Sequence, residues 1–135
     1  MSVTEVTRKG FEMSDELSRL PPQVQQRLLR LQQLQQTLQT VLTQKQQLEL
    51  ELTEVEQASS ELEKLTDAAV IYKSIGSLLV KSERANVTNE LNERKELLKM
   101  RIDVLGKQEE RLRSQVKDLQ TKLQQDLRPL PPPSS

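Results

Sequence analysis

The chain has 135 residues, with 20 basic and 20 acidic side chains and a formal net charge of zero; it contains no Cys, His or Trp, and only one Phe and one Tyr. So little aromatic bulk argues against an ordinary globular core, whereas the abundant Gln, Leu, Glu, Lys and Arg are good helix formers. Balanced charge argues against nucleic acid as the main partner, because phosphate binding needs a basic excess on one face.

The composition also argues against catalysis. Without His or Cys the usual nucleophilic and metal-binding arrangements are missing, and there is no glycine-rich phosphate loop. We therefore expect no enzyme activity, no metal and no cofactor. No apolar run is long enough to span a bilayer and no signal peptide is evident, so we expect a cytosolic protein with no membrane partner.

The first half of the chain predicts one long helix after a flexible N-terminal segment, residues 1–20. Met13 is an alternative start, in which case residues 1–12 are an extension. The helix is predicted over residues 21–66, because Pro21 and Pro22 suit a first helical turn. Its apolar side chains recur at steps of three and four residues, which is typical of a coiled-coil seam with polar interruptions at Lys45 and Ser59. The seam consists of Val24, Leu28, Leu31, Leu34, Leu38, Val41, Leu48, Leu52, Val55 and Leu62.

The middle of the chain, Val70 to Lys81, is the only stretch that is typical of β-structure. β-Branched and aromatic residues flank Gly76 and Ser77, which suit a tight turn, so a β-hairpin is predicted over residues 69–82. An isolated two-stranded hairpin is marginally stable in water and leaves two unpaired edges. We therefore expect this hairpin to pair with hairpins of other chains, which would make the protein a subunit of an oligomer.

A second helix is predicted over residues 83–127, with Ser82 as its N-cap and Asn86 as the competing cap. Lys95 and Glu109 interrupt its seam, and Gly106 lies off the seam without an evident reason. The seam consists of Leu91, Leu98, Ile102, Leu105, Leu112, Val116, Leu119 and Leu123. Residues 128–135 form a Pro-rich tail, which is either a solvated end or a ligand for an SH3-like module.

The two periodic stretches have equal lengths, so folding about the hairpin predicts an antiparallel coiled coil within one chain. In this register Leu28 lies opposite Leu123, and Lys45 comes within about a turn of Glu109, with which it is expected to pair. The fold class is therefore mainly α, with a central β-hairpin.

Apolar residues gather where both termini meet, at the end of the predicted coiled coil. Two interpretations remain open. These side chains either form a partly exposed binding surface for other apolar groups or merely close the coiled coil. The residues are Leu20, Val24, Leu28, Leu31, Leu119, Leu123, Leu127 and Leu130.

Several stretches resemble the β class of prefoldin subunits, archaeal type. They are Leu20 to Gln25, Gln46 to Leu50, the hairpin from Val70 to Lys81, and Lys107 to Leu112. No single motif is specific, but the order of helix, single hairpin and matching helix is a strong combined signal. The resemblance covers roughly residues 20–127, and one hairpin fits the β class because the α class carries two.

The resemblance implies a heterohexamer of two α-class and four β-class subunits whose hairpins form a double β-barrel between subunits. The family is an ATP-independent holdase that captures unfolded proteins between coiled-coil tips and passes them to a group II chaperonin. The residues gathered near the termini then become the client-binding tips. The subunit assembly surface becomes Val70, Ile71, Tyr72, Ile75, Gly76, Leu78, Leu79 and Val80.

The main alternative is a structural coiled-coil tether or scaffold that binds no client. A basic-zipper DNA-binding protein is less suitable, because no basic segment precedes the heptads. Suppression of aggregation without ATP would separate the holdase from the tether.

Overall fold

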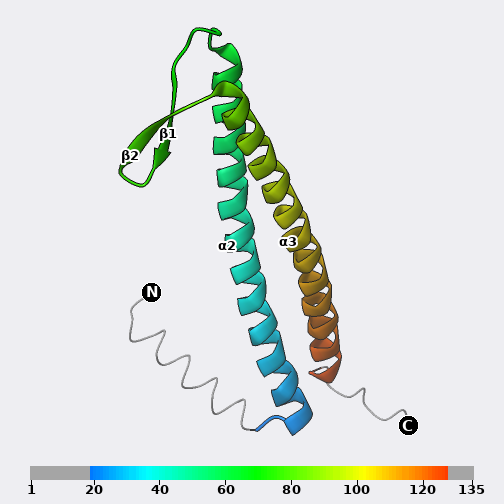
Figure 1. The fold of residues 1–135 in the computed structure, drawn as a ribbon. Helices are drawn as coiled ribbons and strands as arrows, with labels where there is room; N and C mark the ends of the chain where they lie inside the picture. Colours follow the sequence, from blue (N-terminus) through cyan, green and yellow to red (C-terminus); the bar gives the residue numbers. More distant parts are fainter. Residues whose placement is uncertain (1–18, 128–135) are drawn as a thin grey trace, which may run out of the picture. The chain divides into compact units, whose positions relative to one another are not determined.

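The computed structural model describes residues 19–127, which form two long helices joined by a two-stranded β-hairpin (Figure 1). In chain order the elements are α2 (Pro22–Lys64), β1 (Ile71–Ile75), β2 (Leu78–Ser82) and α3 (Arg84–Asp126). Each helix has 43 residues. The predicted mainly α class, with two long helices around a central antiparallel hairpin, is confirmed. Residues 1–18, Leu130 and the Pro-rich tail lie outside the described residues.

The helix ends follow local signals to within one or two residues. α2 begins at Pro22, one residue after the predicted start, and the carbonyl of Pro21 accepts hydrogen bonds from the backbone N–H groups of Val24 and Gln25. The helix ends at Lys64, two residues before the predicted end, and α3 begins and ends one residue inside its predicted range. Thr66 and Asp67 follow α2, in a segment where such residues favour a turn.

The predicted start signal of α3 is wrong. Ser82 is the last residue of β2 and pairs with Ile71, and its hydroxyl donates to the carbonyl of Val80. Glu83 precedes the helix, and its carbonyl accepts the backbone N–H of Val87. Asn86 lies within the first turn of the helix, so it is not the cap either. Because α3 begins at Arg84, the N-cap position falls on Glu83, and Ser82 lies one residue too early, still paired with Ile71 in the strand ladder.

The hairpin has a tight turn at Gly76 and Ser77. The strands are antiparallel, and Ile75 pairs with Leu78 directly across the turn. Gly76 has a φ of 58°, and no residue other than glycine in the described part has a positive φ. A positive φ at the first turn residue alone matches a type II′ turn, which favours glycine at that position.

The described residues divide into two compact units, each of which we describe separately. The terminal unit contains residues 19–39 and 110–127. Val24, Leu34 and Leu123 are buried there, and the ion pair between Arg27 and Asp126 joins the two helices. The chain therefore forms a small antiparallel helix pair in this unit.

The hairpin unit, Thr40–Glu109, contains the hairpin and the adjoining parts of both helices. Val41 and Leu62 are buried there, and Leu98 is fully buried. Ion pairs join Lys45 to Glu109 and Glu51 to Arg94, so α3 runs antiparallel to α2 here as well. Every predicted seam position in both units, including the four polar ones, is buried or half-buried, which confirms the predicted seams.

Candidate functional site

The hairpin carries a dense set of uncovered apolar side chains. Six of them are between 43% and 73% exposed, although this is the most apolar stretch of the chain. We call them the hairpin surface: Val70, Tyr72, Ile75, Leu78, Leu79 and Val80. Exposed apolar side chains gathered in one patch are uncommon on monomers and mark sites of interaction.

The strand register distributes this apolar surface over both faces of the hairpin. Residues paired across antiparallel strands share a face, and successive residues alternate between faces. One face therefore carries Ile71, Lys73, Ile75, Leu78, Val80 and Ser82, and the other carries Tyr72, Ser74, Leu79 and Lys81. A strand with apolar residues on both faces is typical of sheets that are covered on both sides.

One face of the hairpin is tied to α3. The ammonium group of Lys73 lies 2.5 Å from a carboxylate oxygen of Glu90. Ile71, Lys73 and Ser82 on this face are half-buried, whereas Tyr72 and Leu79 on the opposite face are exposed. The hairpin unit therefore leaves the Tyr72 face without a cover among the described residues.

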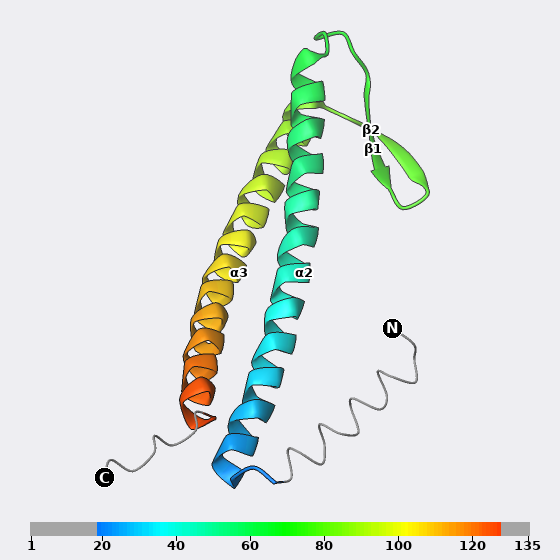
Figure 2. The ribbon, with the colours of Figure 1, turned by 180° about the vertical axis from the view of Figure 1, so that it is seen from behind.

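Both edges of the hairpin are open. The sheet has only two strands, so each strand has one side with no partner among residues 19–127. Figures 1 and 2 show that no other described element lies along either edge. Unpaired backbone N–H and C=O groups at such edges are a template for pairing with another strand.

The residues predicted near the termini do not share one environment. Val24 and Leu123 are buried in the helix pair, and Leu20, Leu28, Leu31 and Leu119 are half-buried. Leu127 is 56% exposed, and Leu130 lies outside the described residues. The buried pair closes the coiled coil in the terminal unit, so the exposed apolar surface there is smaller than the predicted set.

The structure adds exposed apolar residues that the sequence analysis did not single out. Leu29 is 59% exposed in the terminal unit, where Leu127 is the other exposed large apolar side chain among the described residues. In the hairpin unit, Leu50, Met100 and Val104 are also exposed. All of them lie off the predicted seams. An apolar residue outside the seam could therefore have been predicted from the sequence to be exposed.

A shallow apolar groove of about 340 Å³ lies in the hairpin unit. It is lined by Leu48, Met100, Arg101, Val104 and Leu105. Its residues come from both helices, and two of them, Leu48 and Leu105, are seam residues. Nothing in its lining is suited to acid–base or nucleophilic chemistry.

No cluster of three or more His, Cys, Asp or Glu side chains that could hold a metal ion occurs between residues 19 and 127. Within the same range, neither helix is long and apolar enough to cross a membrane. Buried side-chain polar atoms without a hydrogen-bond partner are also absent from this part of the chain.

Comparison with known proteins gives one consistent result. A family model described as prefoldin subunit matches residues 25–129. The chain is 47% identical to prefoldin subunit beta of Methanothrix thermoacetophila, over 84% of this chain and 94% of the relative. It is 43% identical to prefoldin subunit beta of Pyrococcus furiosus, over 84% of this chain and 97% of the relative. The crystal structure of the prefoldin beta subunit from Thermococcus strain KS-1 matches with a TM-score of 0.77 and 44% identity, over 82% of this chain and 97% of that chain.

Proposed function

Because the chain belongs to the prefoldin family, as a β-class subunit, we propose that it assembles with α-class subunits into an ATP-independent holdase. Two α-class and four β-class subunits would build the complex, and residues 21–127 would form the prefoldin-like domain. The family is one of non-enzymatic chaperones, so the chain is not an enzyme.

The observation that carries this proposal is the uncovered hairpin. Its apolar side chains lie on both faces and both of its edges are open. Burying one large aliphatic side chain contributes about 1.5–3 kcal/mol, so covering several of them supplies a strong drive for association. Strands from neighbouring subunits would satisfy the edges, and closure into a barrel between subunits would leave no free edge.

Client capture would use exposed apolar side chains of the terminal unit. Non-native proteins expose apolar segments, and Leu29 and Leu127 offer them uncovered apolar area. Each such contact is weak, but several subunits engaging one client raise the overall affinity without any new contact. No nucleotide is needed for this kind of binding. The captured protein would then pass to a group II chaperonin, which places the activity in the cytoplasm.

The test has two parts, of which the first concerns assembly. The chain is mixed with an α-class subunit of archaeal prefoldin, and the mass is measured by native mass spectrometry. We expect a complex of two α-class and four copies of this chain. A mixture that contains only the separate subunits would contradict the proposed assembly.

The second part concerns client binding. A denatured protein is diluted from guanidinium in the presence of the complex and without ATP, and its aggregation is followed by light scattering. We expect scattering to fall in proportion to the complex added. A correctly assembled complex that leaves aggregation unchanged would instead favour the structural tether, an alternative consistent with the burial of Val24 and Leu123.

A further inference from the structure

The first residue of α3 is a cation in an unfavourable position. Arg84 opens the helix, and no acidic residue lies in the first turn. The N-terminus of a helix carries a partial positive charge, which disfavours an arginine there. An arginine at this position therefore needs a compensating contact elsewhere.

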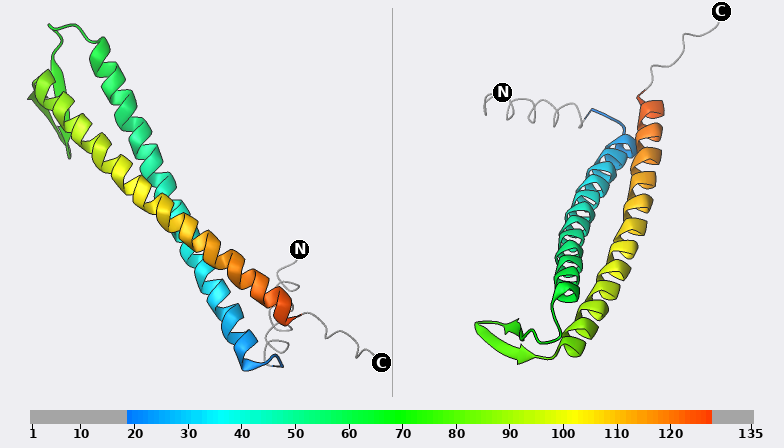
Figure 3. Two further views of the ribbon diagram at one scale, coloured as in Figure 1. Left: turned by 90° about the vertical axis from the view of Figure 1, so that its right-hand side faces the viewer. Right: turned by 90° about the horizontal axis from the view of Figure 1, so that it is seen from above.

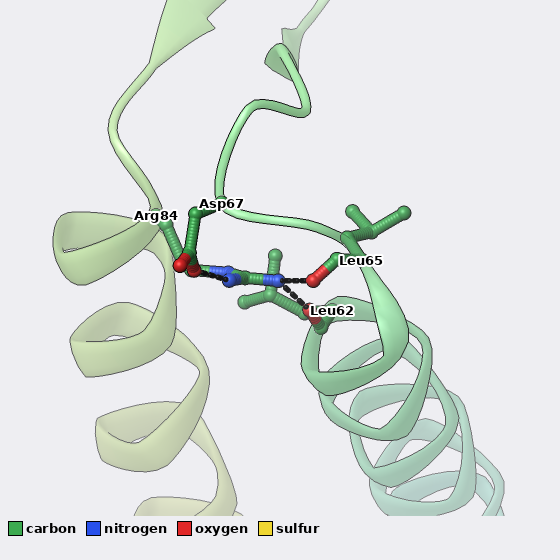
Figure 4. A network of polar contacts seen from close by, with 4 residues as sticks. All are labelled: Leu62, Leu65, Asp67 and Arg84. Carbon is green, nitrogen blue, oxygen red and sulfur yellow. Dashed lines mark hydrogen bonds and ion pairs between the residues drawn. The ribbon is translucent and has the colours of Figure 1, made fainter.

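The compensating contacts lie at the far end of α2. Figure 4 shows the guanidinium of Arg84 reaching across to the end of that helix. Its Nη2 donates to the carbonyl of Leu62 at 2.7 Å and also to the carbonyl of Leu65. Its Nη1 donates to Oδ1 of Asp67 at 3.0 Å. One side chain thus joins the start of α3 to Leu62 in the last turn of α2 and to Leu65 and Asp67 just beyond that helix.

The two carbonyl contacts carry most of this interaction. The last carbonyls of a helix have no partner within the helix and carry a partial negative charge, so a cation there is favourable. The side chain of Asp67 is fully exposed, and an exposed ion pair contributes little. The planar fork of a guanidinium reaches two carbonyls and a carboxylate together, whereas a lysine ammonium is a single point charge.

Arg84 spans the two places where the hairpin leaves the helices. The chain passes from Leu65 through Thr66 and Ala69 into β1, and it returns from β2 through Glu83 directly to Arg84. We call residues 65–70 and Glu83, which connect the hairpin to the helices, the hairpin root. We propose that Arg84 is a positioning residue, which binds both sides of the hairpin root and holds the hairpin at a fixed orientation to the helices. The Lys73–Glu90 ion pair provides a second, weaker tie on the same side, between β1 and α3.

This proposal rests on the proposed function, because orientation matters only if the hairpin pairs with other subunits. A hairpin that swings freely must be ordered at the moment of assembly, and the lost entropy weakens association. The backbone joins the hairpin to the helices through two connections, residues 65–70 after α2 and Glu83 before α3, and Figure 3 shows both from two sides. We therefore expect loss of Arg84 to weaken assembly while both helices remain formed.

The test measures hairpin orientation directly. The chain contains no cysteine, so spin labels at Ser77→Cys and Lys99→Cys report one distance within the hairpin unit by double electron–electron resonance. Excess unlabelled chain suppresses distances between subunits. We expect a narrow distance distribution for the otherwise natural chain and a clearly broader one for Arg84→Ala. Arg84→Lys should resemble Arg84→Ala, and Asp67→Asn should stay narrow.

Arg94 provides a matched control, because it makes an ion pair with Glu51 across the same two helices but lies away from the hairpin root. Arg94→Ala should leave the distance distribution narrow. With an α-class partner, Arg84→Ala should assemble about tenfold more weakly than Arg94→Ala, at a temperature where circular dichroism shows equal helix content in both variants.

The outcomes separate the two ideas. A distribution that is already broad in the natural chain, or that stays narrow in Arg84→Ala, would overturn the positioning role. So would equal assembly of the Arg84→Ala and Arg94→Ala variants. If the natural chain fails to assemble with the α-class partner, the proposed function fails, while the spin-label distances still decide whether Arg84 orients the hairpin.

Discussion

Among single residues, the polar seam positions say most about how the two helices pair. Lys45 and Glu109 interrupt the apolar periods of α2 and α3, and their predicted pairing is confirmed by an Nζ–Oε1 distance of 3.2 Å. Their side chains are only 28% and 18% exposed. A pair that is largely withdrawn from water penalises any register in which either charge is left alone.

The first prediction concerns the energy of this pair. A double-mutant cycle with Lys45→Met and Glu109→Gln should give a coupling energy of about 0.5–1 kcal/mol, measured by urea unfolding at one fixed protein concentration. The control pair is Lys107 with Asp103, at the same 3.2 Å distance but 70% and 67% exposed. Its coupling should be smaller, because water screens both charges. Equal coupling in the two pairs would show that desolvation does not strengthen the Lys45–Glu109 contact.

The second prediction uses the two described glycines that occupy contrasting conformations. A Cβ built on Gly106 would meet no heavy atom within 4 Å, and Gly106 lies inside α3. Gly106→Ala should therefore stabilise the chain by about 1 kcal/mol, through better helix propensity. Gly76→Ala should destabilise it by about 1 kcal/mol, because the φ of 58° is strained for alanine. Thermal unfolding of both variants measures the difference, and a destabilising Gly106→Ala would reveal a packing role for that glycine.

Among the elements, the helices and the hairpin differ in how much of their apolar surface is buried. α2 and α3 bury one stripe against each other, as their periods of three and four residues require. The hairpin has apolar residues on both faces and covers only part of one of them against α3. The rest of its apolar area stays exposed among the described residues. We propose that another subunit covers it.

The third prediction compares two leucines of similar exposure in different elements. Leu79 in β2 is 73% exposed and Leu50 in α2 is 67% exposed. Leu79→Ser should weaken assembly with an α-class subunit by at least about tenfold, since a buried leucine contributes about 1.5–3 kcal/mol. Leu50→Ser should change it by less than about twofold. Titration of the subunits followed by native mass spectrometry measures both, and a similar loss for Leu50→Ser would place the assembly surface on the helices as well.

At the scale of the whole molecule, the two units have different exposed surfaces. The hairpin unit presents the hairpin surface, and the terminal unit presents Leu29 and Leu127. The comparisons cover most of the chain, so the family assignment applies to both units together. The proposed division of labour is assembly through the hairpin unit and client binding through the terminal unit.

The fourth prediction tests that division. The double variant Leu29→Ser with Leu127→Ser should assemble normally but suppress client aggregation about tenfold less well, because several weakened contacts act on each client. The control is Leu50→Ser with Met100→Gln, which removes exposed apolar area from the hairpin unit instead. Light scattering during dilution of a denatured protein measures both variants. If the Leu29→Ser, Leu127→Ser variant suppresses aggregation normally, client binding must depend on other residues.

Sequence periodicity by itself determined the two helices, their antiparallel pairing and the partnership of Lys45 with Glu109. These features depend on the spacing of apolar and charged residues along a helix, and that spacing can be read directly from the sequence. The turn at Gly76 and the start at Pro22 are local in the same sense, because each depends on the backbone preference of one residue.

Only the tertiary structure decided which residue flanks α3, which groups Arg84 binds and which apolar side chains are buried. It placed Ser82 in a strand rather than at a helix cap, and it brought Arg84 to the carbonyls of Leu62 and Leu65. It also buried Val24 and Leu123 while leaving Leu29 exposed. These outcomes depend on residues that are about ten to a hundred positions apart in the chain, a range over which local propensity carries no information.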